Sequence, residues 1–284
     1  MSVFVKSFSV GEGDMYTILD REQGGNLTVI DCCISADRES EILSELRQDG
    51  PSFRFISTHP DEDHIRGLAK LKDDIRVLWA CNNGIDEMFP SEDMKVYRQL
   101  FNSEFTITAG SSIAYKKKGI GIDFLWPKED SVEFKNAVAR AKETKKAYNN
   151  TSPILIYTYK GCASFMWMGD LSSDYLSSIS KLVAWRHVDV LFAPHHGRDR
   201  VPLEILGKLT PRLIVIGEAA SDDIVYYDKY CEVCQNTAQD ILFECDERKI
   251  HLFSSGPVSD KVRRSLVQDG SRTRYTQYKG TVSI

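Results

Sequence analysis

The sequence has no long apolar run. No stretch of its 284 residues approaches the ~18 uninterrupted apolar residues that a helix needs to cross a bilayer. Residues 1–14, MSVFVKSFSVGEGD, lack a basic segment followed by an apolar core, which makes them a poor signal peptide. The seven cysteines are an odd number and irregularly spaced, which favours reduced thiols over a disulfide framework. These absences predict a cytoplasmic protein that does not bind a membrane.

A strong net charge is also missing. The formal charge of −5, from 36 basic and 41 acidic residues, argues against a strongly basic nucleic-acid-binding protein and against an acidic tail. Because both signs are mixed along the chain, a local basic groove remains compatible with this composition.

Linkers, low-complexity segments and solenoid-length repeats are absent, so residues 1–284 are expected to form a single domain. The polar residues 256–284 could form a loosely docked C-terminal extension that offers a surface to a protein partner. Helical patterns occur at Ala36–Asp49, Lys135–Asn150 and Ser172–Trp185, and the segment HIRGLAKLK predicts another helix that begins at His64. Apolar runs typical of strands are Val3–Val10, Tyr16–Leu19, Leu27–Cys32, Phe53–Thr58, Ile75–Ala80, Ile122–Pro127, Pro153–Lys160, Ala163–Asp170, Val188–His196, Arg212–Glu218, Asp240–Glu244 and Ile250–Ser255. This order predicts an α/β domain with sheets inside and helices outside.

Histidine is scarce, and its distribution is uneven. Four of the six histidines lie in two short motifs, STHPDEDHIRG and VDVLFAPHHG, each at the end of an apolar run. A third run, FMWMGD, ends in an aspartate. Taken singly, each motif could be a capped turn or a polar corner. Together they favour a dinuclear metal site, because crowded carboxylates and imidazoles need a cation among them. The predicted ligands are His59, Asp61, Asp63, His64, Asp170, His195 and His196.

The pattern H-x-D-x-D-H, followed downstream by GD and PHHG, resembles the metallo-β-lactamase fold. More narrowly, it resembles the hydrolase domain of the ComEC competence proteins and their stand-alone relatives. The likeness extends in order over about residues 3 to 217, through FSVGEGDMYTIL, TVIDC, HIRGL, NNTSPILIYTYKGCASFMWMGD and VDVLFAPHHG. It implies an αββα sandwich with the site at one edge.

The resemblance also implies a hydrolase that uses a metal-bound hydroxide. Two divalent cations, Mn²⁺ or Zn²⁺, would share Asp170, and the aspartate at position 61 favours Mn²⁺ because it makes its site richer in oxygen. His59 and Asp61 would hold one cation. The ligands of the other would be Asp63, His64 and one of the paired histidines, His195 or His196. The expected catalytic residues are Asp63, Asp170 and His195.

The substrate implied by the resemblance is a phosphodiester, with single-stranded DNA as the first candidate. Lysines of the helix at Lys135–Asn150 could guide a polyanion, although a solvated helix face explains them equally well. The substrate-facing candidates are Asn149, Asn150, Ser152, Lys145 and whichever of the paired histidines does not bind metal, with His196 as the first candidate.

Two other functions stay open, namely a hydrolase of small esters, thioesters or lactams and a catalytically weak partner protein in a multi-gene system. Departures from the family pattern leave a reduced or specialised activity open, and the missing Gly-His-Pro histidine and the polar tail favour the partner protein. Arg198 follows PHHG where relatives carry serine, and the later Gly-His-Pro is absent. His251 could take over the role of the missing histidine.

Overall fold

The computed structural model describes residues 2–21, 26–83, 91–115, 119–144, 148–159, 163–246, 248–272 and 276–283. Within these ranges the strands form two sheets. The first has eight strands in the spatial order β15 (Tyr278–Ser283), β14 (Lys249–Ser254), β13 (Ile241–Asp246), β1 (Val3–Ser7), β2 (Tyr16–Asp20), β3 (Asn26–Ile30), β4 (Phe53–Ile56) and β5 (Ile75–Trp79). The second has seven, in the order β12 (Glu232–Cys234), β11 (Leu213–Ile216), β10 (Val190–Phe192), β9 (Ala163–Trp167), β8 (Ile154–Tyr159), β7 (Ile120–Trp126) and β6 (Ser112–Ala114).

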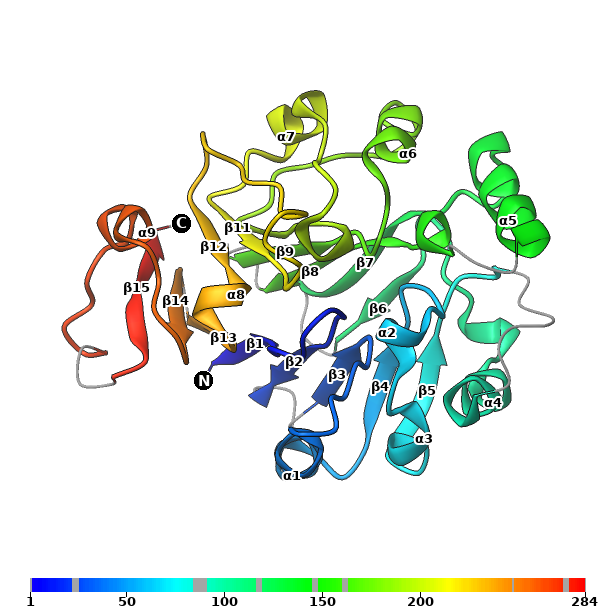
Figure 1. Ribbon diagram of the computed structural model, residues 1–284, viewed down its shortest axis with the longest axis horizontal. Helices are drawn as coiled ribbons and strands as arrows, with labels where there is room; N and C mark the ends of the chain where they lie inside the picture. The colour runs from blue at the N-terminus through cyan, green and yellow to red at the C-terminus, as the bar shows by residue number, and fades with distance from the viewer. Residues whose placement is uncertain are drawn as a thin grey trace.

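The longer helices lie outside the two sheets (Figure 1). The eight-stranded sheet is covered by α1 (Glu39–Asp49), α3 (Leu68–Leu71) and α4 (Glu92–Leu100). The seven-stranded sheet carries α6 (Ser173–Ser178) and α7 (Leu203–Leu209), with α5 (Val132–Thr144) beside them. Short elements in the connections are α2 (Glu62–Ile65), α8 (Gln235–Ala238), α9 (Asp260–Ser265) and the 3₁₀ turns η2 (Ser103–Phe105), η3 (Asn149–Thr151) and η4 (His195–Gly197). The αββα arrangement predicted from the sequence is therefore confirmed.

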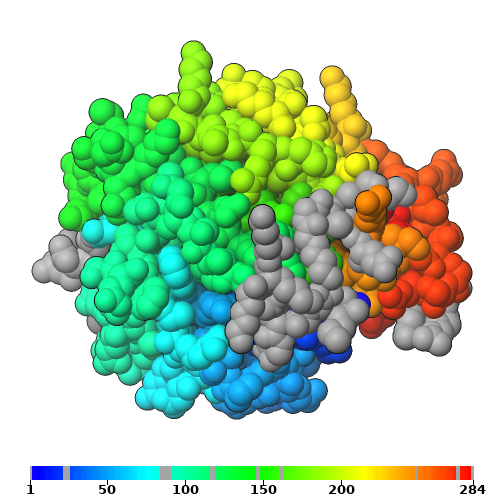
Figure 2. All heavy atoms as spheres, turned by 180° about the vertical axis from the view of Figure 1, so that it is seen from behind, coloured from blue at the N-terminus to red at the C-terminus, as the bar shows by residue number. Residues whose placement is uncertain are grey.

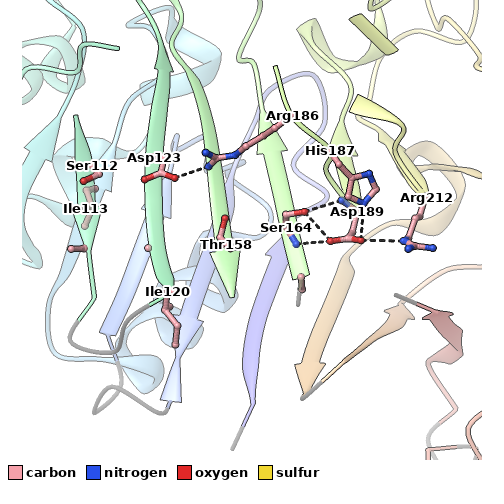
Figure 3. A pocket seen from close by; sticks show the side chains of 14 residues that line it. Ser112, Ile113, Ile120, Asp123, Thr158, Ser164, Arg186, His187, Asp189 and Arg212 are labelled. Carbon is pink, nitrogen blue, oxygen red and sulfur yellow. Dashed lines mark hydrogen bonds and ion pairs between the residues drawn. The ribbon is translucent and has the colours of Figure 1, made fainter. Parts of the chain in front are cut away.

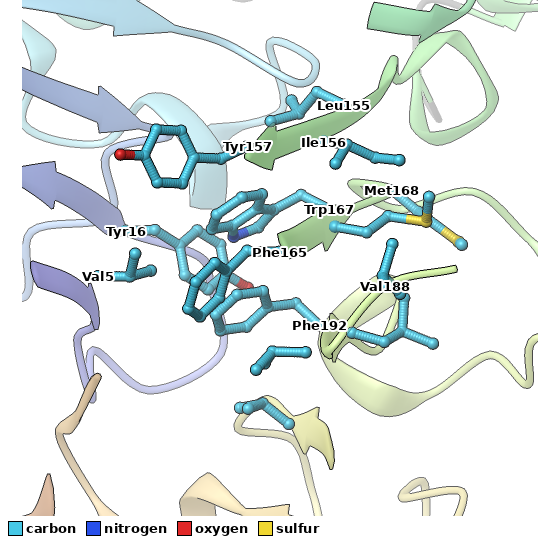
Figure 4. Close-up of a cluster of buried hydrophobic side chains, with 14 of the residues drawn as sticks. Val5, Tyr16, Leu155, Ile156, Tyr157, Phe165, Trp167, Met168, Val188 and Phe192 are labelled. Atoms are coloured by element: carbon cyan, nitrogen blue, oxygen red, sulfur yellow. The ribbon is translucent and has the colours of Figure 1, made fainter. Parts of the chain in front are cut away.

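Aromatic side chains fill the space between the sheets (Figure 4). The rings of Trp167 and Phe192, on neighbouring strands of the seven-stranded sheet, stack with centroids 4.8 Å apart. Tyr16, from the opposite sheet, meets Phe192 edge-on at 4.9 Å. Such offset and edge-on pairs add to the stabilisation from area burial alone. These rings form a packed core next to the strands that carry the three motifs.

Parallel pairing brings the motifs to one edge of the sandwich. β3 pairs with β4, and β9 pairs with β10, in parallel. Because the carboxyl ends of parallel strands meet at the same edge, the residues that follow these four strands gather there. The residues in question are Asp31, the segment from His59 to His64, Asp170 and the pair at 195–196.

Two expected elements differ in the structure. The helix predicted over Ser172–Trp185 ends at Ser178, where serine hydroxyls bond back to carbonyls of the preceding turn. The helix expected directly after His64 is divided into α2 and α3, because Gly67 between them adopts a φ of +97°.

The C-terminal residues are incorporated into the eight-stranded sheet. β15 is its edge strand and pairs with β14 from Lys249 to Phe253. Seen from behind, residues coloured orange to red gather at one end of the molecule (Figure 2). Among the described residues, no helix has the length and apolar character required to cross a bilayer.

Candidate metal centre

Four imidazoles converge on one carboxylate. The Nε2 atoms of His59, His64, His195 and His196 lie 3.8, 3.3, 3.8 and 3.4 Å from Oδ2 of Asp170. Asp170 is almost fully buried, at 3% exposure. The four imidazole nitrogens therefore surround a single oxygen of a buried carboxylate.

The two remaining aspartates of the first motif divide the histidines into two groups. Asp61 Oδ2 lies 3.5 Å from His59 Nε2. Asp63 Oδ2 lies 3.3 Å from His196 Nε2 and 4.0 Å from His64 Nε2. All seven ligands predicted from the sequence are thus brought together.

Each imidazole ring also contacts a side chain of the protein through its Nδ1 atom. This arrangement leaves Nε2 facing inward, as metal-ligating histidines require. The partners are Ser152 Oγ for His59 at 3.3 Å, Asp31 Oδ2 for His64 at 2.9 Å, Asp199 Oδ2 for His195 at 2.7 Å and Asp14 Oδ1 for His196 at 3.2 Å. The three aspartates among these partners were not predicted from the sequence. Asp14 and Asp31 lie far in the sequence from the histidines that they contact, so no local pattern indicates them. Asp199 lies four residues after His195, and this proximity was the one available sequence signal.

Asp14 connects the site to the core. Its Oδ1 accepts a hydrogen bond from the Tyr16 hydroxyl at 2.8 Å. Asp14, His64, Asp170 and His196 have potential ligand atoms within 4.8 Å of one another. Asp14, however, lies against Nδ1 of His196, whereas the two carboxylates near Nε2 belong to Asp63 and Asp170. We therefore assign Asp14 to holding His196 and Asp63 to the ligand set.

The residues present fit a metal ion. His59 Nε2, His64 Nε2, His196 Nε2 and Asp170 Oδ1 are buried, and none has a hydrogen-bond partner in the described part of the chain. Carboxylate oxygens lie nearby, but not in hydrogen-bonding geometry. Buried polar atoms without partners cost free energy unless a bound ligand or ion satisfies them. Imidazole and carboxylate donors together suit a divalent cation.

The charged groups of the site shift one another's pKa values. Burial by itself would raise the pKa of Asp170, but His64 and His196 hold it well below its usual range. Burial would lower the pKa of His64, yet Asp170 and Asp31 raise it well above its ordinary value. The pKa of His196 is raised against burial by Asp14 and Asp170 in the same way. Histidines bind metal ions in their neutral form, so a cation bound at Nε2 would take the place of a proton there.

Backbone strain is concentrated at the site. In the described chain, five non-glycine residues have positive φ, and three of them are Asp31 at 54°, His195 at 53° and His196 at 54°. A left-handed conformation costs ~1–2 kcal/mol for such residues. Strain of this kind persists where the surrounding structure enforces a functional geometry.

Gly169 permits the close approach of Asp170 to the histidines. It has a φ of +50°, and a Cβ atom there would lie 2.6 Å from Ser152 Oγ and 2.8 Å from Thr58 Cβ. A side chain at this position would therefore displace the segment that carries Asp170 or the residues packed against it.

The predicted substrate-facing residues separate into different roles. Asn149 lies in the site, with Nδ2 3.4 Å from His195 Nε2. Ser152 is fully buried, and its hydroxyl contacts His59 and accepts the backbone N–H of Asp170. Asn150 uses its Oδ1 to accept from the backbone N–H and hydroxyl of Ser172. We therefore reassign Ser152 and Asn150 from substrate contact to support of the site.

The paired histidines also differ from each other. His196 is 1% exposed and faces Asp63 and Asp170, which is the environment of a ligand rather than of a substrate-binding group. The His195 side chain is 26% exposed and is the one of the pair that is open to solvent. Lys145 lies outside the described residues.

His251 does not replace the missing histidine of the family pattern. Its Nδ1 contacts Thr281 Oγ1 at 2.8 Å and its Nε2 contacts Asp246 Oδ2 at 3.2 Å, between β14 and its neighbouring strands. It is therefore part of the sheet's own hydrogen bonding.

A hollow of about 620 Å³ lies on the seven-stranded sheet, away from the metal centre (Figure 3). It is lined by residues of β6, β7 and β8 and by residues at or before the starts of β9, β10 and β11, whereas the histidine cluster follows the ends of β9 and β10. Its charged groups are paired with one another, Arg186 with Asp123 and Arg212 with Asp189. The hollow thus contributes no group to the site.

Comparisons with known proteins give distant structural matches. No protein-family model matches the sequence, and no curated protein sequence matches it. The structure is similar to the crystal structure of the B3 metallo-β-lactamase BLEG-1, with 15% identity over 62% of this chain and 83% of that chain and a TM-score of 0.38. It is also similar to the 2.1 Å crystal structure of a metallo-β-lactamase from Staphylococcus aureus subsp. aureus COL, with 13% identity over 79% of this chain and 58% of that chain and a TM-score of 0.39.

Proposed function

We propose that this protein is a metal-dependent hydrolase that cleaves phosphodiesters, with single-stranded DNA as the first substrate to test. The proposal rests on one observation above all. Four histidine Nε2 atoms surround a single buried oxygen of Asp170, and buried atoms of this cluster have no hydrogen-bond partner in the described chain. Such a constellation is arranged for divalent cations, and we propose two of them, Mn²⁺ or Zn²⁺.

When bound, two divalent cations would polarise a phosphoryl oxygen and lower the pKa of water towards neutrality. The protein's own part is to fix the geometry. Asp31, Asp199, Asp14 and Ser152 hold the four imidazole rings through Nδ1, so that no reorganisation is needed when substrate binds. Of these partners, Asp31 and Ser152 are fully buried.

The open side of the site is formed by three partly exposed ligand candidates. The side chains of His195, Asp61 and Asp63 are 26, 24 and 31% exposed. Substrate would therefore approach across these residues. Asn149, which lies beside His195, could donate a hydrogen bond to a substrate oxygen.

The phosphodiester assignment rests on the oxygen-rich ligand set, with three aspartates, and on the likeness of the sequence motifs to ComEC-type hydrolase domains. Two cations that contact both the attacking and the leaving oxygen suit in-line displacement at phosphorus. A small-molecule hydrolase and a weakly catalytic partner protein are the alternatives that the experiment must separate.

The test is a substrate screen on protein reconstituted with Mn²⁺ or Zn²⁺, using single-stranded DNA, RNA, cyclic nucleotides, nitrocefin and a thioester. We expect cleavage of at least one phosphodiester. Asp170→Ala should reduce that rate by ~10³-fold or more, because it removes the carboxylate shared by all four histidines. Asp123→Asn, a charge change on the distant hollow, serves as the matched control and should leave the rate unchanged.

Three results would overturn the proposal in different ways. Turnover of nitrocefin or the thioester without any phosphodiester cleavage would establish the small-molecule hydrolase. Bound metal without turnover of any substrate would favour the partner protein. Equal rates for the parent and Asp170→Ala would remove the metal centre from the mechanism altogether.

A further inference from the structure

Arg198 directly follows the histidine pair of the metal centre in the sequence and has unused hydrogen-bonding capacity. It follows the His195–Gly197 turn, and its backbone N–H donates to the carbonyl of His195 at 2.8 Å. Its Nε is buried and has no partner among the described residues. The guanidinium is a planar fork with five donors, so an unsatisfied Nε leaves one edge of this fork incomplete.

Within the described residues, Arg198 forms an ion pair with an exposed glutamate. Arg198 Nη2 lies 2.8 Å from Glu12 Oε2, and the Glu12 side chain is 61% exposed, whereas that of Arg198 is only 25% exposed. A pair in which one member is this exposed contributes little to stability, ~0–1 kcal/mol. An incoming anion could therefore displace Glu12 at small cost.

The position of this pair relates it to the site and not to a remote surface. Glu12 lies two residues before Asp14, whose carboxylate contacts His196 and whose N–H donates to the carbonyl of Asp63 at 3.2 Å. Arg198 lies two residues after His196. The pair therefore joins the two segments that border the His196–Asp63 side of the cluster.

We propose that Arg198 binds the anionic oxygens of the substrate and selects anionic over neutral substrates, with Glu12 as a competitor that occupies it until substrate arrives. A phosphate or phosphodiester group that replaces Glu12 can accept from Nη2, in the charge-assisted contact that arginine makes with phosphate. The inference extends the proposed hydrolase function by naming the group that recognises the charge of the substrate.

The experiment compares an anionic with a neutral substrate on the Mn²⁺-loaded protein. The ratio of kcat/KM for bis(p-nitrophenyl) phosphate to that for p-nitrophenyl acetate should fall about 10- to 100-fold in Arg198→Ala. Arg198→Lys should fall between the parent and the alanine variant, because it keeps the charge but loses the fork. Glu12→Gln should raise the ratio up to about 5-fold, because the competitor is weakened.

Arg200→Ala is the matched control. It removes the same charge two residues later, but its guanidinium donates to the carbonyl of Tyr226 and does not contact Glu12. The substrate ratio of this variant should stay within about 3-fold of the parent, since a general electrostatic effect is small at this exposed position. An equal loss in Arg200→Ala and Arg198→Ala would show a nonspecific charge effect and refute the assignment.

A structural role for the pair predicts a different pattern. If Arg198 and Glu12 merely hold two loops together, Glu12→Gln would lower activity on both substrates, as Arg198→Ala would. Binding of inorganic phosphate to the metal-loaded protein, measured by titration calorimetry, provides a readout that does not depend on turnover. Phosphate should bind about 10-fold more weakly to Arg198→Ala than to the parent. Equal binding refutes the role of Arg198, whether or not the hydrolase proposal holds. Weaker binding in a protein that cleaves no phosphodiester would support Arg198 and refute the proposed reaction.

Discussion

Replacing Asp14 tests whether contacts at Nδ1 fix the orientation of the imidazole rings. Asp14 is 6% exposed, contacts His196 Nδ1 at 3.2 Å and accepts the Tyr16 hydroxyl at 2.8 Å. In Asp14→Ala the ring of His196 loses the group that orients it. Removing such an outer partner typically costs 10–100-fold in metal affinity, that is, about 1.4–2.7 kcal/mol of binding free energy.

The same change should also lower the free energy of unfolding. The Tyr16 hydroxyl is buried, with the residue only 5% exposed. Without Asp14 it would lose its acceptor, at a cost of about 1–3 kcal/mol. Asp14→Asn keeps an acceptor oxygen and should show a smaller loss of both stability and affinity, because only the charge is removed.

The assay is titration calorimetry of the metal-free variants with Mn²⁺, accompanied by urea unfolding. Asp123→Asn is the control, because it removes a carboxylate of an exposed ion pair with Arg186 on the distant hollow. An affinity of Asp14→Ala within 2-fold of the parent would refute the holding role. A loss of one whole equivalent of bound cation would instead make Asp14 a direct ligand.

Three further predictions address strain, pH dependence and metal linkage. Gly169→Ala should destabilise the protein by about 1–3 kcal/mol in urea unfolding, because its Cβ would lie 2.6 Å from Ser152 Oγ at a φ of +50°; an unchanged midpoint would contradict this. Asp240 accepts from Arg38 at 2.7 and 2.9 Å, and although burial opposes it, Arg38 lowers its folded-state pKa. The stabilisation that this pair gives is therefore fully present above the unfolded-state pKa of Asp240, about 3.9, and is lost as the pH falls through its folded-state pKa. Asp240→Asn should lower the free energy of unfolding by ~1–3 kcal/mol at pH 7 and by progressively less below pH 4. Adding Mn²⁺ at about 1,000 times its Kd should stabilise the protein by ~4 kcal/mol in thermal unfolding, reversibly with EDTA and not in Asp170→Ala.

The sequence by itself determined the layers and the ligand motifs, because both depend on patterns of residues that are close together in the chain. Apolar runs of strand length end in polar residues at His59, Asp170 and His195, and parallel pairing then brings those ends to one edge. Strands with weak apolar patterns were not foreseen. β6, β12 and β15 are short or polar, and they form because a neighbouring strand supplies hydrogen bonds and not because of their own sequence preference.

Only the tertiary structure decided which polar residue serves which purpose. Ser152 and Asn149 are near neighbours in the sequence, yet one supports His59 from within the core and the other lies beside His195. Asp14 contacts His196 across 182 positions of the chain, a separation that no local pattern encodes. The physical reason is that a strand end fixes the direction of a side chain, while its partner comes from whichever distant strand end the sheets place beside it.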